Sequence, residues 1–158
     1  MANYSIYHPV PAMVQPMDWA CWYTCYQMVV AYQRGVGRPG NLRDPSEVPW
    51  VQGIFTANRG VGTDDPEERG RVAAALGFDC HYESVTADGM ADLLRAAPII
   101  YDGQWAGYRN GHAVVIVGVS AANVVINNPA TGMETYNYDN FIGQTLVQTR
   151  SRALVTPP

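Results

Sequence analysis

The sequence contains no lysine: all ten of its basic residues are arginine. Lysine is normally among the commonest residues of a soluble protein. Two explanations stay open: a GC-rich genome, or delivery into a eukaryotic cytosol, where lysine side chains accept ubiquitin. The arginines are outnumbered by 14 acidic residues, which gives a formal charge of -4. Because such a chain offers no basic surface to phosphate groups, we do not expect nucleic acid as a partner.

Long apolar runs are also missing. No stretch approaches the roughly 20 residues that span a bilayer, and no basic segment leads into an apolar run of the signal-peptide kind. We therefore expect a soluble protein with no signal peptide and no membrane contact, either cytoplasmic or exported into a target cell by a dedicated secretion system. Since 47% of the 158 residues are hydrophobic, we expect residues 1–158 to form one domain.

Cysteine is scarce, with only Cys21, Cys25 and Cys80 in the chain. Three cysteines cannot all pair within one chain, and their spacing fits none of the usual zinc patterns. Cys80 and His81 are neighbours, but adjacent side chains point in different directions and make a poor metal site. We therefore expect no disulfide framework, no metal and no other cofactor. His8 is expected to be an exposed loop residue.

Three segments of the first half combine helical periodicity with capping or breaking residues at their ends. They are Ala20 to Gln33, Asp65 to Gly77, and Thr86 to Leu94. Asp65 is a good N-cap and Pro66 suits a first helical position, while Pro98 stops the third segment. Residues 34–65 lack periodicity and predict an irregular loop, with at most a short helical turn around Val48 to Phe55.

The second half predicts antiparallel strands, because short runs of β-branched and aromatic residues follow one another. They are Ile99 to Tyr101, His112 to Val119, Val124 to Asn127, Thr135 to Tyr138, and Thr145 to Thr149. The run Ala113 to Val117 is apolar on both faces, which is typical of a central strand covered on both sides. Helices followed by strands predict an α+β fold, in which an N-terminal helical half packs on a C-terminal antiparallel sheet or half-barrel.

Cys21 is the candidate nucleophile. It begins the first predicted helix, where free backbone N–H groups and the helix dipole stabilise a thiolate and lower the pKa of the thiol. A lone cysteine is more often a buried packing residue, which is the role we expect for Cys25, one helical turn further on. Gln15, six residues before Cys21, can bring its side-chain amide to the same helix end. Together with the backbone N–H of Cys21 it would form an oxyanion hole.

His112 and Asn128 complete the candidate site. His112 opens the predicted central strand, and Asn128 closes the next strand 16 residues later. A hairpin would return both side chains to the same end of the sheet. A hydrogen bond from the imidazole to the amide oxygen would fix the tautomer, so that the other ring nitrogen takes the proton of Cys21. Each residue also has a simpler interpretation: His112 as a core histidine, and Asn128 as a turn former with Asn127 orienting the imidazole instead.

The segment QPMDWACW, from Gln15 to Trp22, resembles the nucleophile motif of papain-like (clan CA) cysteine peptidases, in which glutamine precedes the catalytic cysteine by six positions. The chain is most similar to compact bacterial members: bacteriocin-leader peptidases and the effector cysteine proteases of plant pathogens. Their histidine strand and the Asp-Pro segment after it are similar to His112 to Gly118 and to Asn128-Pro129. Trp22 stands where leader peptidases have glycine, and Asn128 where compact members favour aspartate, although papain itself uses asparagine.

The resemblance implies a papain-like fold and a cysteine endopeptidase. Cys21 would be the nucleophile, His112 the general base and Asn128 its orienter. Gln15 would serve in the oxyanion hole. The partners implied are a protein or peptide substrate and, for a secreted effector or toxin, a cognate inhibitor or immunity protein. Two alternatives stay open: the same triad acting as a glutamine deamidase or transglutaminase, and a catalytically inactive papain-fold binding module.

Overall fold

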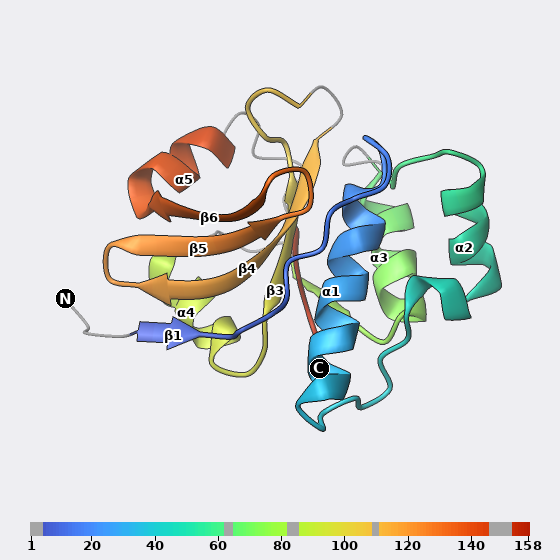
Figure 1. The fold of residues 1–158 in the computed structure, drawn as a ribbon, viewed down its shortest axis with the longest axis horizontal. Helices are drawn as coiled ribbons and strands as arrows, with labels where there is room; N and C mark the ends of the chain where they lie inside the picture. The colour runs from blue at the N-terminus through green and yellow to red at the C-terminus, as the bar shows by residue number, and fades with distance from the viewer. Residues whose placement is uncertain (1–4, 62–64, 82–85, 109–110, 146–152) are drawn as a thin grey trace.

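The computed structural model describes residues 5–61, 65–81, 86–108, 111–145 and 153–158. Figure 1 shows its helices and strands in chain order. They are β1 (Ser5–Tyr7), α1 (Cys21–Gly35), η1 (Pro45–Glu47), α2 (Pro49–Thr56), α3 (Pro66–Ala75), β2 (Asp79–His81), α4 (Ala87–Leu94), β3 (Ile99–Gly103), β4 (His112–Ser120), β5 (Asn123–Asn128), β6 (Gly132–Asn137), α5 (Tyr138–Thr145) and β7 (Ala153–Thr156). The strands form one antiparallel sheet in the order β2-β7-β3-β4-β5-β6, and β1 pairs with β4 beside this path.

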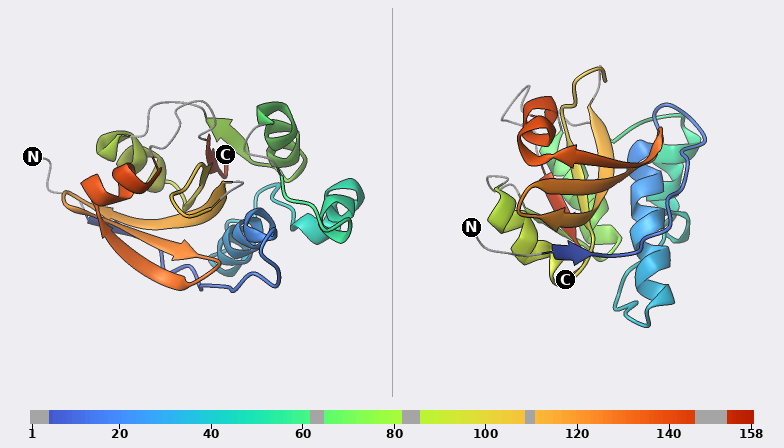
Figure 2. Two further views of the ribbon diagram at one scale, coloured as in Figure 1. Left: turned by 90° about the horizontal axis from the view of Figure 1, so that it is seen from above. Right: turned by 60° about the vertical axis from the view of Figure 1, so that its left-hand side comes forward.

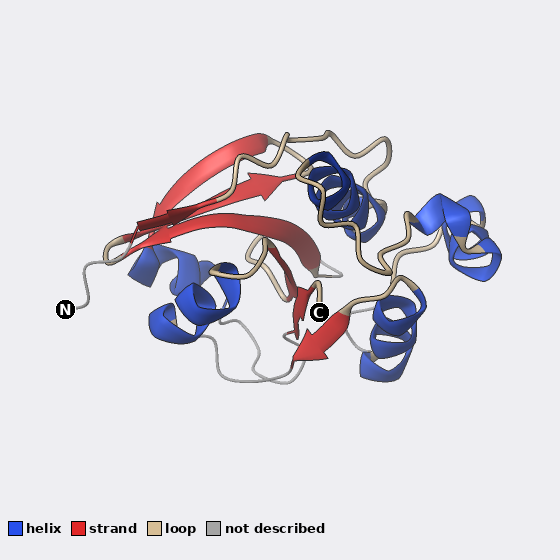
Figure 3. Ribbon diagram, turned by 90° about the horizontal axis from the view of Figure 1, so that it is seen from below, coloured by secondary structure: helices blue, strands red, loops and turns tan. Residues whose placement is uncertain are grey.

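Helices cover both faces of the sheet. α1 lies against one face, and α4 and α5 lie against the other (Figure 2, Figure 3). The side chains of β4 alternate between the two layers: Val115 and Val117 pack with α1, whereas Val114 and Ile116 pack with α4 and α5. Each such burial contributes about 1.5–3 kcal/mol. The expected central strand and the α+β architecture are therefore confirmed.

The three helices that the sequence predicts are confirmed as α1, α3 and α4. Asp65 accepts a hydrogen bond from the backbone N–H of Glu68 (2.9 Å), and Thr86 accepts one from the backbone N–H of Gly89 (3.0 Å). Both side chains therefore cap the helices that they were expected to begin. Gly77 has a φ of 84°, a left-handed conformation that glycine adopts readily, and it follows the end of α3.

The expectation of an irregular loop over residues 34–65 is wrong for η1 and α2. Asp44 and Glu47 form a capping box, in which each side chain accepts a hydrogen bond from the other end of the turn. Pro49 then occupies the first position of α2, where its missing N–H costs nothing. The short turn expected around Val48 to Phe55 is consequently a complete helix.

Three predicted strands are confirmed as β3, β4 and β5. The sequence does not predict β1, β2 or β7, because runs of three or four residues are too short to show alternation. The strand expected at Thr135 to Tyr138 is β6, but it ends at Asn137, whose side chain accepts a hydrogen bond from the N–H of Asp139 (3.0 Å) and so helps to begin α5. Of the strand expected at Thr145 to Thr149, Thr145 ends α5 and residues 146–149 lie outside the described residues.

His8 lies in a loop, as expected, but the expectation that it is exposed is wrong. The segment after β1 runs along the sheet between α1 and α4, and its backbone N–H at His8 donates to Val117 O (2.7 Å). The half-buried imidazole contacts the hydroxyl of Tyr32 (3.2 Å) and the carbonyl of Leu94 (2.6 Å). Packing of this segment across β4 therefore encloses a histidine that the local sequence places in a loop.

Among the residues that the structure describes, no helix combines the length and the apolar character needed to cross a membrane. The N-terminal end of α1 and the start of β4 lie at the same end of the molecule (Figure 1). This arrangement brings together the segments that carry the candidate site residues.

We predict that Ile116→Ala lowers the free energy of unfolding by about 2–5 kcal/mol, because it leaves a cavity in a fully buried position of the central strand. Met133→Ala is the control, since the Met133 side chain is 62% exposed and its removal should change stability by less than about 0.5 kcal/mol. Urea unfolding followed by circular dichroism measures both. Equal losses in the two variants would contradict the two-layer core.

Candidate active site

Cys21 is the first residue of α1, and its half-buried side chain lies at the positive end of the helix. Ala20, the N-cap, supplies no side-chain acceptor, so the first backbone N–H groups stay available. The backbone N–H groups of Cys21 and Trp22 are within hydrogen-bonding reach of the sulfur. Cys25, one turn further on, is fully buried in the core, which confirms its expected packing role.

The sulfur of Cys21 also faces the start of β4. It is within hydrogen-bonding reach of the backbone N–H of Ala113, the residue after His112. Burial raises the pKa of the thiol to about 11, and the charge of Asp102 adds to this, although the backbone N–H groups lower it. The lowered pKa expected from the helix end is therefore wrong for the thiol by itself. Loss of hydration outweighs the helix dipole.

His112 and Asn128 are brought together by the pairing of β4 with β5. His112 Nε2 lies 2.8 Å from Asn128 Oδ1, and the imidazole is only 1% exposed. Burial lowers the pKa of His112, and the bond to Asn128 partly opposes this by raising it. Asn127 points to the opposite face, where its amide donates to Val10 O (2.8 Å). Because an amide oxygen only accepts, Nε2 carries the proton and Nδ1 is the free acceptor.

Gln15 lies on the segment before α1, held to the β5–β6 turn by a hydrogen bond from its backbone N–H to Pro129 O (2.8 Å). Its side-chain nitrogen donates to Met17 O (2.9 Å). A carboxamide nitrogen carries two N–H groups, so this bond leaves one for a ligand. Gln15 lines the same cavity as Cys21.

A cavity of about 590 Å³ joins these residues, because Gln15, Cys21 and His112 all line it. Its other walls come from the segment before α1, from the start of α1, from residues 60–61, from β3 and the loop before β4, and from the β5–β6 turn. They are Asp18, Trp19, Trp22, Gly60, Val61, Asp102, Gly107, Tyr108, Gly111 and Ala130. A peptide segment fits a cleft of this size between the helical half and the sheet.

Sequence reasoning missed Asp102, which lines the cavity from β3. It lies opposite Ala113 in the sheet and forms an ion pair with Arg69 of α3 (Nε to Oδ2, 2.9 Å), with both side chains buried. Burial raises the pKa of Asp102 to about 6, although the charge and hydrogen bond of Arg69 lower it. A lone acid in the apolar run Ile99 to Gly103 is the signal that could have revealed it, because buried charges are paired.

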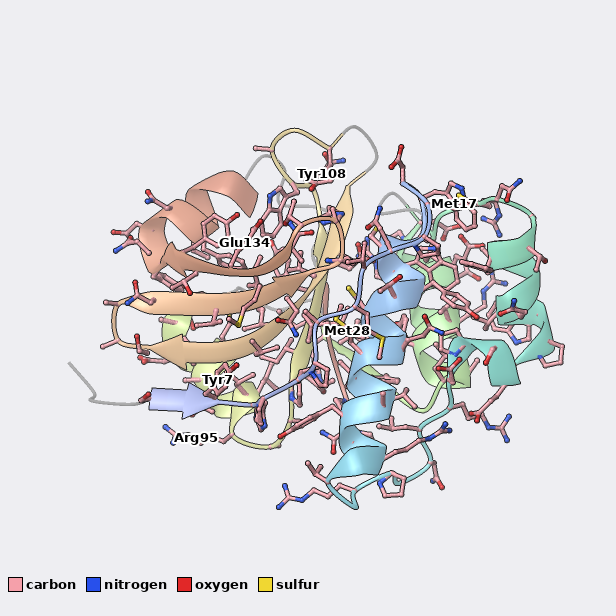
Figure 4. All side chains as sticks on the ribbon, in the orientation of Figure 1. Tyr7, Met17, Met28, Arg95, Tyr108 and Glu134 are labelled. Carbon is pink, nitrogen blue, oxygen red and sulfur yellow. The ribbon has the colours of Figure 1, made fainter. Side chains whose placement is uncertain are left out.

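Tyr108 was also missed. Its ring stacks on the imidazole of His112, with centroids 3.9 Å apart and planes within 7°. Figure 4 shows Tyr108 on the loop that precedes β4. Trp105 makes a T-shaped contact with the same imidazole, with ring centroids 6.1 Å apart. Two aromatic rings therefore restrict the rotation of His112, and only their closeness in sequence to His112 pointed to this.

In the described ranges, no three His, Cys, Asp or Glu side chains gather closely enough to hold a metal ion. Cys80 and His81 lie on β2, where His81 contacts the hydroxyl of Thr156 (3.1 Å).

Comparison with known proteins gives three findings. A family model described as "Papain-like cysteine protease AvrRpt2" matches residues 4–145. A double-glycine-motif protease from an AMS/PCAT transporter, solved in complex with the leader peptide, is 19% identical with a TM-score of 0.58, and the match covers 97% of this chain and 95% of that chain. The peptidase domain of Streptococcus ComA, a bifunctional ABC transporter involved in quorum sensing, is 14% identical with a TM-score of 0.61, covering 94% and 99%. No curated protein matches the chain.

We predict that Asp102→Asn lowers the free energy of unfolding by about 3–5 kcal/mol, because it leaves the buried guanidinium of Arg69 without this carboxylate. Asp92→Asn is the matched control, because it breaks an ion pair on the surface. The side chains of this pair are 78% exposed for Asp92 and 59% exposed for Arg95. That exposed pair should contribute less than about 1 kcal/mol. Urea denaturation at pH 7.5 compares the variants. A loss no larger than that of the control would contradict the structural role of the buried pair.

Proposed function

The chain belongs to the AvrRpt2 family of papain-like cysteine proteases, and we propose that it hydrolyses peptide bonds through a triad of Cys21, His112 and Asn128. The expected papain-like fold is confirmed by the two solved structures that it resembles. The observation that carries the proposed triad is the 2.8 Å contact between His112 and Asn128 at the cavity that Cys21 lines. It leaves Nδ1 of the imidazole as the acceptor for the thiol proton.

Proton transfer from Cys21 to His112 creates the reactive pair. A thiol with a pKa of about 11 and an imidazole whose pKa is lowered by burial each resist ionisation alone. When the proton moves from Sγ to Nδ1, the two charges stabilise each other in a site of low polarity. The thiolate therefore exists as a partner of the imidazolium, which Asn128 holds in position.

The thiolate attacks the carbonyl carbon of the substrate, so that a C–S bond forms and the carbonyl electrons move to oxygen. We assign stabilisation of this oxyanion to the second amide N–H of Gln15 and the backbone N–H of Cys21. Collapse of the intermediate breaks the C–N bond, and the imidazolium of His112 gives its proton to the leaving amine. Water, deprotonated by the same imidazole, then hydrolyses the thioester and releases the acid.

We propose a protein or peptide as the substrate, bound along the cavity between the segment before α1 and the loop that carries Tyr108. A double-glycine-motif protease of the same fold has been solved with a leader peptide, which supports a peptide ligand here. The same acyl-enzyme chemistry can begin from a glutamine side chain, so deamidation is the competing outcome of the tests below. We further propose that residues 1–158 act as one peptidase domain, because both core layers share β4.

We also propose that this protease is a bacterial effector or toxin, exported into the cytosol of a eukaryotic target. Two observations support this: the chain has no lysine, and its family model carries the name AvrRpt2. A lysine-free chain presents no side-chain amine for ubiquitin. The producing cell would need an inhibitor or immunity protein against the protease, encoded beside it.

We predict that iodoacetamide modifies Cys21 of the folded protein at pH 7 and that His112→Ala slows this reaction by at least about tenfold. Only the thiolate reacts, and without the imidazole it forms near a pKa of about 11, so the rate should then rise about tenfold per pH unit up to that value. Cys80→Ser removes the other half-buried thiol and should leave the rate unchanged. Peptide mapping identifies the modified residue. A rate at Cys21 that is independent of His112 would contradict the triad.

Proteolysis and deamidation are separated by mass spectrometry of a eukaryotic cell extract incubated with the protein. New peptide termini that disappear with Cys21→Ser are the result expected. A gain of about one dalton on glutamine, without new termini, would replace proteolysis by deamidation. Neither change, with Cys21 unreactive, would indicate a binding module.

We predict that Arg38→Lys combined with Arg43→Lys shortens the lifetime of the protein in a eukaryotic cytosol severalfold, because two exposed amines then accept ubiquitin. Arg38→Gln combined with Arg43→Gln is the control, because it changes the same two exposed positions without adding an amine. Pulse–chase labelling, with and without a proteasome inhibitor, compares the pairs. Identical lifetimes would contradict the link between the absence of lysine and ubiquitin, and would favour genome composition as its explanation.

A further inference from the structure

The chain of hydrogen bonds that begins at His112 continues beyond Asn128. Asn128 Oδ1 accepts from His112 and also from the backbone N–H of Ala130 (3.0 Å). The nitrogen end of the same amide lies near Glu134, and Asn128 is among the groups that lower the pKa of this carboxyl. Because Oδ1 already accepts from two donors, the orientation of the amide is fixed, and its N–H groups are left to face the carboxylate.

Glu134 reaches Asn128 because of the pairing between β5 and β6. Asn128 lies opposite Gly132, and Ile126 lies opposite Glu134, so the two polar side chains share one face as diagonal neighbours. Gly132 has no side chain to fill the space between them. Figure 4 labels Glu134 on β6 and Tyr108 on the loop that precedes β4.

The carboxylate of Glu134 is itself held in place. The hydroxyl of Thr131 donates to Oε1, and the hydroxyl of Tyr136 donates to Oε2. Partial burial by itself would raise the pKa of Glu134, but the bonds from Thr131, Tyr136 and Asn128 and the charge of His112 together lower it. Glu134 is therefore a fixed anion at neutral pH.

We propose that Glu134 is a positioning residue of the peptidase, which fixes the amide of Asn128 and places a full negative charge behind this neutral orienter. The proposal rests on the proposed function. Asn128 carries no charge and by itself stabilises the imidazolium less than a carboxylate would. Glu134 supplies that charge from the position diagonal to Asn128 on the next strand, and its field raises the pKa of His112.

Other ionisable groups also surround the imidazole. Cys21 faces it from α1, Asp102 from β3 and Tyr108 from the loop before β4. Asp102 is paired with Arg69, so its charge is largely neutralised. Glu134, on β6, has hydroxyls and an amide as its partners and keeps its charge. It is therefore the carboxylate whose loss should change the protonation of His112 most.

The first test measures His112 directly in a Cys21→Ser background by NMR titration of the imidazole. Glu134→Gln keeps an oxygen that accepts from Asn128 and removes the charge, so the pKa of His112 should fall by about one unit, equivalent to tenfold in the equilibrium. Glu67→Gln, which removes an exposed acid from α3, should leave it unchanged. Glu134→Asp should recover part of the fall. A purely structural role would leave the pKa in place, and that result would overturn the proposal.

The second test exchanges the two functional groups. Asn128→Asp alone sets two carboxylates against each other, which should slow alkylation of Cys21 by iodoacetamide at pH 7 by about tenfold. Asn128→Asp combined with Glu134→Gln restores one charge and one amide in the reverse order, and the rate should return to within about threefold of the unmodified protein. The proposal would be overturned if the double variant is folded but its alkylation rate falls by as much as the falls of the two single variants combined.

These outcomes separate this proposal from the proposed function. If Cys21 of the unmodified protein reacts in a His112-dependent way and Glu134→Gln changes neither the rate nor the pKa of His112, only the role of Glu134 fails. If the pKa of His112 responds to Glu134→Gln but Cys21 is unreactive, the hydrogen-bond chain stands and the proposed function fails.

Discussion

The pairing of β4 with β5 is the constraint on which the rest of the site depends. It places His112, at the start of one strand, 2.8 Å from Asn128, at the end of the other. The register shifts by one residue between Ile116 and Gly118, where β4 contains an irregularity. Without that shift, the pairing near the hairpin would continue unchanged and Asn127 would share the face of His112. One extra residue in β4 therefore decides which asparagine meets the imidazole.

Two opposing effects set the chemistry of Cys21. The helix end and three backbone N–H groups favour a thiolate, but burial outweighs them and raises the pKa of the thiol to about 11. In the proposed mechanism, the reactive thiolate then depends on the imidazole that the sheet supplies. Asp102 stands close enough to oppose a thiolate, and its ion pair with Arg69 limits this effect. The helical half thus contributes two groups to the site: α1 carries Cys21, and α3 carries the Arg69 that pairs with Asp102.

The features that sequence reasoning recovered are those encoded within a few residues of one another. Asp65 and Thr86 begin helices because their side chains bond backbone groups three residues ahead. The run Ala113 to Val117 is a covered strand because its apolar pattern is local. β1, β2 and β7 escaped, since each is short and is stabilised mainly by its partner strand. The sequence interpretation predicted only a short helical turn where α2 is a complete helix, because it did not consider the capping box formed by Asp44 and Glu47.

The sequence by itself determined the positions of Cys21 and Gln15 around the start of a helix, the central strand that His112 opens, and the asparagine pair at the end of the next strand. Tertiary structure decided what these residues experience: the burial that raises the pKa of Cys21, the choice of Asn128, and the contact of Asn128 with Glu134. Capping and alternation are local properties. Hydration, register across a bulge and diagonal contacts between strands depend on chain segments that meet only in the folded protein.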